Sequence, residues 1–264
     1  MKIISRSCHD VRPVFLVAAV LLVFGALPAA TQQVTTGIVN TLIPERGETP
    51  HNDLQGFIYV PFGAAQGSLT VTRRDRGDYT QHIGELGAVW VWGGPFYSEA
   101  RVGLGTDTDD ITSQHGYFDL FYEQAEWYAT GFVRGSNALG GEDRRDYLTS
   151  LGVAWYGYPG LRIVQRLYHG GDSDGERSVS AATRAEYDLT PRIVALAGGS
   201  IGVRFEEGFD VDGAELRSTL NAGVGYRFGD RWRAEYRFEQ GFPVAETRNS
   251  LHTLGLVARF PLER

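Results

Sequence analysis

The chain has 264 residues, a formal net charge of −7 and a hydrophobic fraction of 42%. This acidic balance gives no reason to expect a nucleic-acid partner, because proteins that bind nucleic acid present basic surfaces. Beyond the N-terminus no apolar run approaches the roughly 20 residues that a spanning helix needs. Glycine occurs 34 times, about twice the usual frequency, and aromatic residues make up 12%. The composition favours a glycine-rich, aromatic β protein.

Residues 1–30 predict a secretory signal peptide, and residues 31–264 form the predicted barrel domain. Lys2, Arg6 and Arg12 give a basic start, residues 14–27 are apolar, and small residues follow at Ala29 and Ala30. The alternative is an uncleaved anchor helix, but 14 apolar residues are short for a membrane span. The chain after this segment contains no cysteine, so no disulfide is expected.

Period-two alternation of apolar and polar residues recurs along the rest of the chain and predicts β-strands, whose successive side chains point to opposite faces. The clearest example is 215–238, where Leu216, Leu220 and Val224 alternate with charged or small residues. The predicted strands are 33–42, 54–62, 68–73, 83–92, 96–105, 117–123, 126–134, 147–156, 161–168, 178–189, 193–205, 215–228, 232–239 and 251–260.

The connections between these strands alternate in length. Short turns are expected at 93–95, 124–125, 158–160, 190–191 and 229–230, and longer polar segments at 106–115, 135–146, 169–177, 206–214 and 240–250. Outer-membrane barrels combine short periplasmic turns with longer extracellular loops, whereas the Greek-key connections of a sandwich break such a pattern.

We therefore predict an all-β, antiparallel transmembrane β-barrel of about 14 strands. The alternative is 12 strands, if 33–42 and 54–62 lie outside the barrel; both counts are even, as single-chain bacterial barrels require. Closure follows because no strand edge can stay unpaired in lipid. The expected location is the outer membrane of a Gram-negative bacterium, and the expected partners are its lipid, its lipopolysaccharide and the barrel-assembly machinery.

Two patches of the sequence carry a resemblance to a known family. The front patch comprises Arg73, Arg74, Asp75, Asp78 and Tyr79, followed by 87–90. The middle patch comprises 151–153, Pro159, Gly160, 166–168, Asp172 and Ser173. These patches resemble the YaiO-like outer-membrane barrels. The resemblance implies an integral outer-membrane barrel, and it brings no catalytic residues to this chain.

The polar faces of the later strands predict a charged interior. The candidate lumen-lining residues are Arg162, Arg166, Arg184, Glu186, Arg204, Arg217, Arg227, Arg233, Glu235, Arg237 and Glu239, with Asp188 and Glu206 as further acids. One hypothesis is a passive channel whose arginines favour anions, for small solutes or envelope glycans. The alternative is a salt-bridged interior that fills a non-conducting, structural barrel. Barrels of this size admit both.

Other sites are weaker candidates. Acidic loop segments (Asp107, Asp109 and Asp110; Asp172, Asp174 and Glu176; Asp210 and Asp212) lack the spacing of a calcium loop, so neither a metal site nor a cofactor is expected. They could instead hold divalent ions that bridge lipopolysaccharide.

Ser250 and His252 share a face near the rim, but a third catalytic group is missing. A rim hydrolase, including an acidic protease built from the loop aspartates, is therefore a remote alternative, and we predict no enzyme. The five tryptophans are interpreted as an interface girdle.

Overall fold

The computed structural model describes residues 33–44, 51–62, 65–75, 80–107, 110–138, 145–205, 214–242 and 250–261. The predicted signal peptide, residues 1–30, lies outside this part of the chain. Within it, fourteen strands are found: β1 (Gln33–Ile43), β2 (His51–Phe62), β3 (Ala65–Asp75), β4 (Thr80–Gly93), β5 (Phe96–Asp107), β6 (Asp110–Glu123), β7 (Trp127–Ala138), β8 (Arg145–Tyr158), β9 (Leu161–Asp172), β10 (Arg177–Asp188), β11 (Ile193–Phe205), β12 (Glu215–Phe228), β13 (Trp232–Phe242) and β14 (Ser250–Pro261). None of the described residues forms a helix long and apolar enough to cross a membrane.

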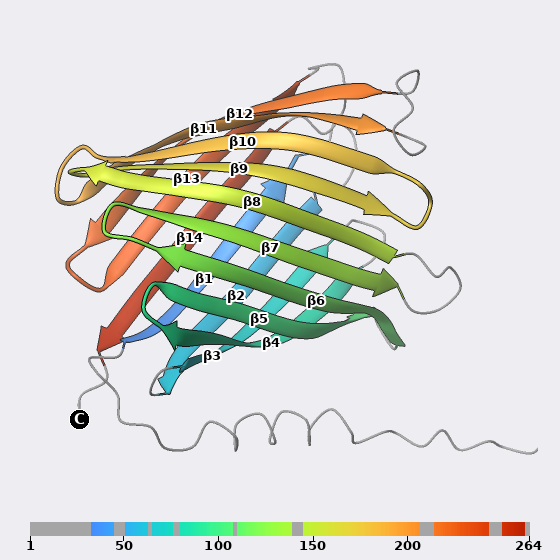
Figure 1. Ribbon diagram of the computed structural model, residues 1–264, viewed down its shortest axis with the longest axis horizontal. Coiled ribbons are helices and arrows are strands. Elements are labelled where there is room, and N and C mark those ends of the chain that lie inside the picture. The colour runs from blue at the N-terminus through green and yellow to red at the C-terminus, as the bar shows by residue number, and fades with distance from the viewer. Residues whose placement is uncertain are drawn as a thin grey trace, which may run out of the picture.

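The strands form one closed barrel in which each strand pairs antiparallel with its neighbours in sequence. The first and last strands complete the circle, with a register that runs from Gln33 opposite Pro261 to Leu42 opposite His252. In Figure 1 the strands run obliquely around the barrel, and those at the front cross the direction of those at the back. Such tilting is required to close a sheet on itself.

The count of fourteen strands confirms the larger of the two predictions. The segments 33–42 and 54–62, which the twelve-strand alternative left outside, form most of β1 and β2. These two strands pair with each other along nine positions. Each described strand has 11 to 14 residues. A tilted strand needs roughly 9–11 residues to cross the hydrocarbon layer, so every strand is long enough to span it.

The connections sort by end as predicted, but four of the five longer ones are shorter than predicted, and only 206–214 has the predicted bounds. The turns between β4 and β5, β8 and β9, and β12 and β13 lie at one end (left in Figure 1). At the other end the predicted loop 106–115 is wrong in its extent, because β5 and β6 leave only residues 108–109 between them. A ladder of backbone hydrogen bonds does not require apolar side chains, so polar residues such as Ser113 continue the strands past the apolar zone.

The outer face carries the apolar half of each alternating pattern. On β12 the side chains of Leu216, Leu220, Val224 and Phe228 are 48–63% exposed. The intervening Thr219, Asn221 and Arg227 are less exposed. This inverted distribution, apolar outside and polar inside, is the one that a barrel surrounded by acyl chains needs.

All five tryptophans of the chain lie near the end with the short turns. Trp90 and Trp92 precede the turn between β4 and β5, Trp127 begins β7, Trp155 lies near the end of β8, and Trp232 begins β13. Their side chains are 38–65% exposed. Tyr122 contacts Trp127, and Phe260 contacts Trp232, through ring pairs. This is the placement expected of an aromatic girdle at one membrane interface.

We expect the outer face of the barrel to tolerate a charged substitution less well than the inner face. Leu220, near the middle of β12, faces outward and is 63% exposed, whereas Val39 of β1 alternates with the outward Ile38 and faces the interior. We expect Leu220→Arg to lower the free energy of unfolding by roughly 2–4 kcal/mol and Val39→Arg by less than about 1 kcal/mol. Urea titrations of the protein refolded into lipid vesicles measure both values. Equal losses would contradict the assignment of the outer face to lipid.

Candidate functional site: the charged inner wall

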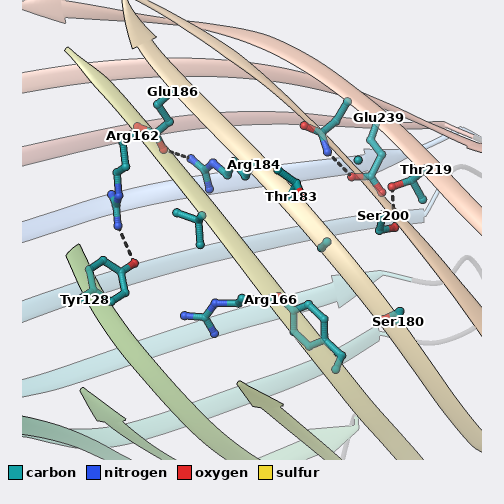
Figure 2. Close-up of a pocket in the computed structure, with 15 residues that line it drawn as sticks. Tyr128, Arg162, Arg166, Ser180, Thr183, Arg184, Glu186, Ser200, Thr219 and Glu239 are labelled. Carbon is teal, nitrogen blue, oxygen red and sulfur yellow. Dashed lines mark hydrogen bonds and ion pairs between the residues drawn. The ribbon is translucent and has the colours of Figure 1, made fainter. Parts of the chain in front are cut away.

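The polar half of the alternation lines the concave side of the barrel. Arg162 of β9 donates from Nη2 to the hydroxyl of Tyr128 on β7 at 2.8 Å, as Figure 2 shows. This bond passes over β8, which is possible only on the concave side. By the same alternation the structure places on this wall Arg162, Arg166, Arg184, Glu186, Asp188, Arg204, Arg217, Arg227, Arg233, Glu235, Arg237 and Glu239. Glu206 lies outside the described residues.

Three arginines and two glutamates form a ladder of ion pairs that joins β10 to β13. Arg184 lies 2.6 Å from Glu186 and 3.6 Å from Glu235. Arg233 lies between the same carboxylates, 3.4 Å from Glu186 and 2.8 Å from Glu235. Arg237 also pairs with Glu235. The ladder therefore ties together two strands that are separated in the sheet by β11 and β12.

Glycines on the intervening strands provide the space for this ladder. A Cβ on Gly225 of β12 would lie 3.2 Å from Nε of Arg233. A Cβ on Gly223 would lie 2.9 Å from Cγ of Arg237, its partner across the pair. The arginine side chains therefore lie along the wall, over residues that have no side chain. The same pairing of an inward arginine with a glycine on the next strand occurs at Arg101 with Gly87, Arg166 with Gly152, Arg184 with Gly198 and Arg217 with Gly202.

Three further arginines of the predicted set are paired locally. Arg227 lies 2.7 Å from Asp188, near the end with the short turns. At the opposite end Arg217 lies 2.7 Å from Glu215, and Arg204 pairs with Glu176. Six of the eight predicted lumen-lining arginines are thus engaged by carboxylates, so the wall is less basic than a count of its residues indicates.

Arg162 and Arg166 differ from the other six. Arg162 bonds the Tyr128 hydroxyl and lies over that ring, 5.6 Å from its centroid. Arg166 lies 3.4 Å from the Ser150 hydroxyl and 5.5 Å from the centroid of Phe132. In the part of the chain that the structure describes, neither guanidinium forms an ion pair. Arg162 is still attracted electrostatically by Glu186, so the charge of Arg166 is the more available of the two to a solute.

Both arginines face a cavity of about 600 Å³ inside the barrel. Its other side carries hydroxyls, an amide and a carboxylate, with Ser200 2.9 Å from Thr219 and Asn221 3.5 Å from Glu239 (Figure 2). One side of this cavity is thus aromatic and cationic, and the other consists of small polar groups. Its volume is in the range of pockets that hold small molecules.

A second polar cluster on the opposite part of the wall was missed by the sequence analysis. Tyr59 of β2 lies 3.3 Å from Glu99 of β5, which lies 2.7 Å from Arg101. Asp119, with 0% exposure, accepts hydrogen bonds from Tyr117 at 2.9 Å and from Thr130. The signal was present, because Glu99 and Arg101 occupy the polar face of the predicted strand 96–105. The predicted lumen-lining residues all lie from Arg162 onward, so the set omits Glu99 and Arg101.

The structure supports neither the predicted Ser250 and His252 pair nor a metal site among the described acidic residues. Ser250 and His252 are not joined: the His252 ring lies 2.8 Å from the hydroxyl of Tyr236, on the outer face. Asp172 accepts the backbone N–H groups of Asp174 and Glu176, each at 3.0 Å, so it shapes the turn between β9 and β10. Asp109, Asp210 and Asp212 lie outside the described residues, as does any carboxylate cluster built on them. The described residues contain no group of side chains with the geometry of a metal site.

The fold is that of bacterial outer-membrane barrels. The chain resembles a bacterial polysaccharide outer membrane secretin, at a TM-score of 0.54 and 12% identity, over 89% of this chain and 100% of that one. It also resembles Salmonella typhi OmpF in complex with daunomycin (TM-score 0.53, 7% identity, 87% and 97%) and the outer-membrane expressed OmpT of Vibrio cholerae (0.52, 10%, 90% and 99%). No protein-family model matches the sequence, and no curated protein matches it closely. At these identities the likeness shows the fold alone.

The glycines beneath the arginines predict a sharp difference in tolerance. A Cβ on Gly223 would lie 2.4 Å from the backbone oxygen of Tyr236, whereas a Cβ on Gly56 of β2 meets nothing within 4 Å. We expect Gly223→Ala to destabilise the folded barrel by about 1–3 kcal/mol, because the added methyl overpacks the wall, and Gly56→Ala to have little effect. Urea unfolding in vesicles measures the difference. A harmless Gly223→Ala would show that the wall has room for a methyl group at this position.

Proposed function

We propose that this protein is an outer-membrane channel for small solutes that favours anions. The observation that carries the proposal is the pair Arg162 and Arg166, which face the interior cavity and form no ion pair among the described residues. Arginines that line a constriction favour anions. The guanidinium group presents several donors in a plane that matches carboxylate and phosphate.

The remaining lining supports acidic sugars and similar polar anions as solutes. Tyr128 and Tyr168 supply ring surfaces beside the arginines, and Ser180, Thr219 and Asn221 supply hydroxyl and amide groups. Rings suit the apolar faces of a sugar, and the small polar groups suit its hydroxyls. Envelope glycans that carry acid groups therefore belong to the proposed class.

The proposed location follows from the fold and the sequence together. We place the barrel, residues 31–264, in the outer membrane of a Gram-negative bacterium, after export through a signal peptide at 1–30 that is then cleaved. The short turns face the periplasm and the longer connections face outward. Outer-membrane lipid, lipopolysaccharide and the assembly machinery are the proposed partners. Within this class we assign the chain to YaiO-like barrels on the sequence patches around Arg73 and Arg166.

A non-conducting structural barrel is the second candidate. The ladder of Arg184, Glu186, Arg233, Glu235 and Arg237 supports it, because the charges of these side chains are paired with one another along the wall. The cluster around Asp119 does the same on another part of the wall. In this case the ion pairs of the interior would stabilise the fold, and the loops would bind any partner.

Conductance across a planar bilayer separates the two candidates. For the channel we expect steady current and a reversal potential, in a potassium chloride gradient, that shows preference for chloride. Arg162→Gln combined with Arg166→Gln is expected to shift this potential toward cations, because two unpaired positive charges leave the path. Arg73→Gln is the control, since Arg73 faces outward and is 56% exposed. Absence of current would support the structural barrel. Current with an unchanged potential would remove these arginines from the path.

We also propose that the protein is not an enzyme, since His252 contacts Tyr236 on the outer face and, among the described residues, no base is bonded to Ser250. We expect purified protein in vesicles to hydrolyse neither ester nor peptide substrates above the rate of empty vesicles. Hydrolysis that His252→Ala abolishes would instead establish the rim hydrolase.

A further inference from the structure

Strands β7 to β9 lie at the front of the barrel in Figure 1, and their outer face carries an apolar hollow. Gly131 forms the floor of a hollow of about 510 Å³. The surrounding side chains of Phe118, Val133, Leu151, Leu167 and Val179 are 44–70% exposed and stand up around it. This apolar hollow lies near mid-depth of the strands, so acyl chains surround it.

A second hollow, of about 450 Å³, lies next to the first in the direction of the longer connections. Its floor is the cross-strand pair Gly116 and Gly135, and its edge is polar, with Gln114, Asn137 and Arg145. A Cβ on Gly116 would meet nothing within 4 Å, so the space is open. The register places this row of residues two positions beyond Phe118 and Val133. The two hollows are therefore consecutive along the strands.

One arginine, Arg145, lines the polar hollow, and a second, Arg177, lies beside it over the ring of Tyr147. Arg145 begins β8 and is exposed. Arg177 begins β10 and lies 5.7 Å from the centroid of Tyr147, whose own position in the register is opposite Gly135. Both hydrogen bonds of Arg177, to the carbonyls of Asp172 and Glu176, use Nη1. In the described residues its Nε and Nη2 have no partner, so the guanidinium can also bind an anion.

We propose that these two hollows form a binding site for a phosphorylated glycolipid of the outer leaflet, of the lipid A class. One acyl chain lies over Gly131, the sugar lies over Gly116 and Gly135, and a phosphate contacts Arg145 and Arg177. Lipid tails are as apolar as leucine, so an apolar hollow alone selects no lipid by polarity. Selection comes from the shape of the floor and from the guanidinium groups, which match phosphate geometry. The site rests on the proposed membrane placement and orientation, and it is independent of conduction.

Native mass spectrometry of the full barrel in detergent, titrated with diphosphoryl lipid A, tests the site. We expect one tightly bound lipid A. Gly116→Leu fills the polar hollow and is expected to weaken binding at least fivefold. Arg145→Gln and Arg177→Gln are each expected to weaken it about fivefold, the amount that one basic residue contributes at an anionic lipid surface. A variant that combines Arg145→Gln and Arg177→Gln is expected to bind diphosphoryl lipid A as weakly as the wild type binds lipid A that lacks its phosphates.

Matched controls lie on the far outer face. Gly84 faces outward on β4 with nothing within 4 Å of an added Cβ, and Arg73 faces outward near the same end as Arg177. Gly84→Leu and Arg73→Gln are expected to leave lipid A binding unchanged. Equal losses in the controls, or no loss in the site variants, would overturn the proposal.

The proposal would also be overturned if the barrel were a dimer without lipid A and Gly116→Leu made it a monomer. A second copy of the chain would then occupy the hollows. A chain that fails to insert into vesicles would instead refute the membrane placement itself.

Discussion

Every feature of this molecule depends on the pairing of β1 with β14. Without that seam, two strand edges, one on β1 and one on β14, would expose backbone N–H and C=O groups to hydrocarbon, where each unsatisfied group costs several kcal/mol. Ten aligned residue pairs close it, from Gln33 with Pro261 to Leu42 with His252. Closure then divides the alternating side chains into two sets, one that faces lipid and one that faces the lumen. Leucines such as Leu220 lie outside, and arginines such as Arg184 lie inside.

The sequence was sufficient for the architecture because period two is a local property. The alternation of Leu216, Leu220 and Val224 with polar residues is readable from the sequence, and so is the sorting of the connections by length. The ends of the strands were not, because the ladder continues through polar residues such as Ser113. The pairing of charges was also beyond sequence reasoning. Which carboxylate meets Arg233 depends on register and tilt, and these join β10 to β13 across two strands.

The abundance of glycine has a specific role in the wall. An arginine side chain that stood upright would project into the lumen, whereas one that lies over Gly223 or Gly152 runs along the sheet. Glycine opposite arginine therefore keeps the lumen wider than its residue volumes indicate. The ladder of β10 to β13 uses this arrangement to hold paired charges flat. The wall of β7 to β9 uses it to present Arg166 beside Phe132, and the two halves of the barrel consequently differ in chemistry.

The tryptophans have a consequence for how the barrel sits in membranes of different thickness. Because indole rings prefer the interface, the rim that carries Trp90, Trp127, Trp155 and Trp232 is held at one depth. The opposite rim has none of the five, and polar residues already extend its strands. When the bilayer thickens or thins, the mismatch is therefore taken up at that opposite rim, while the tryptophan rim stays in register with its headgroups.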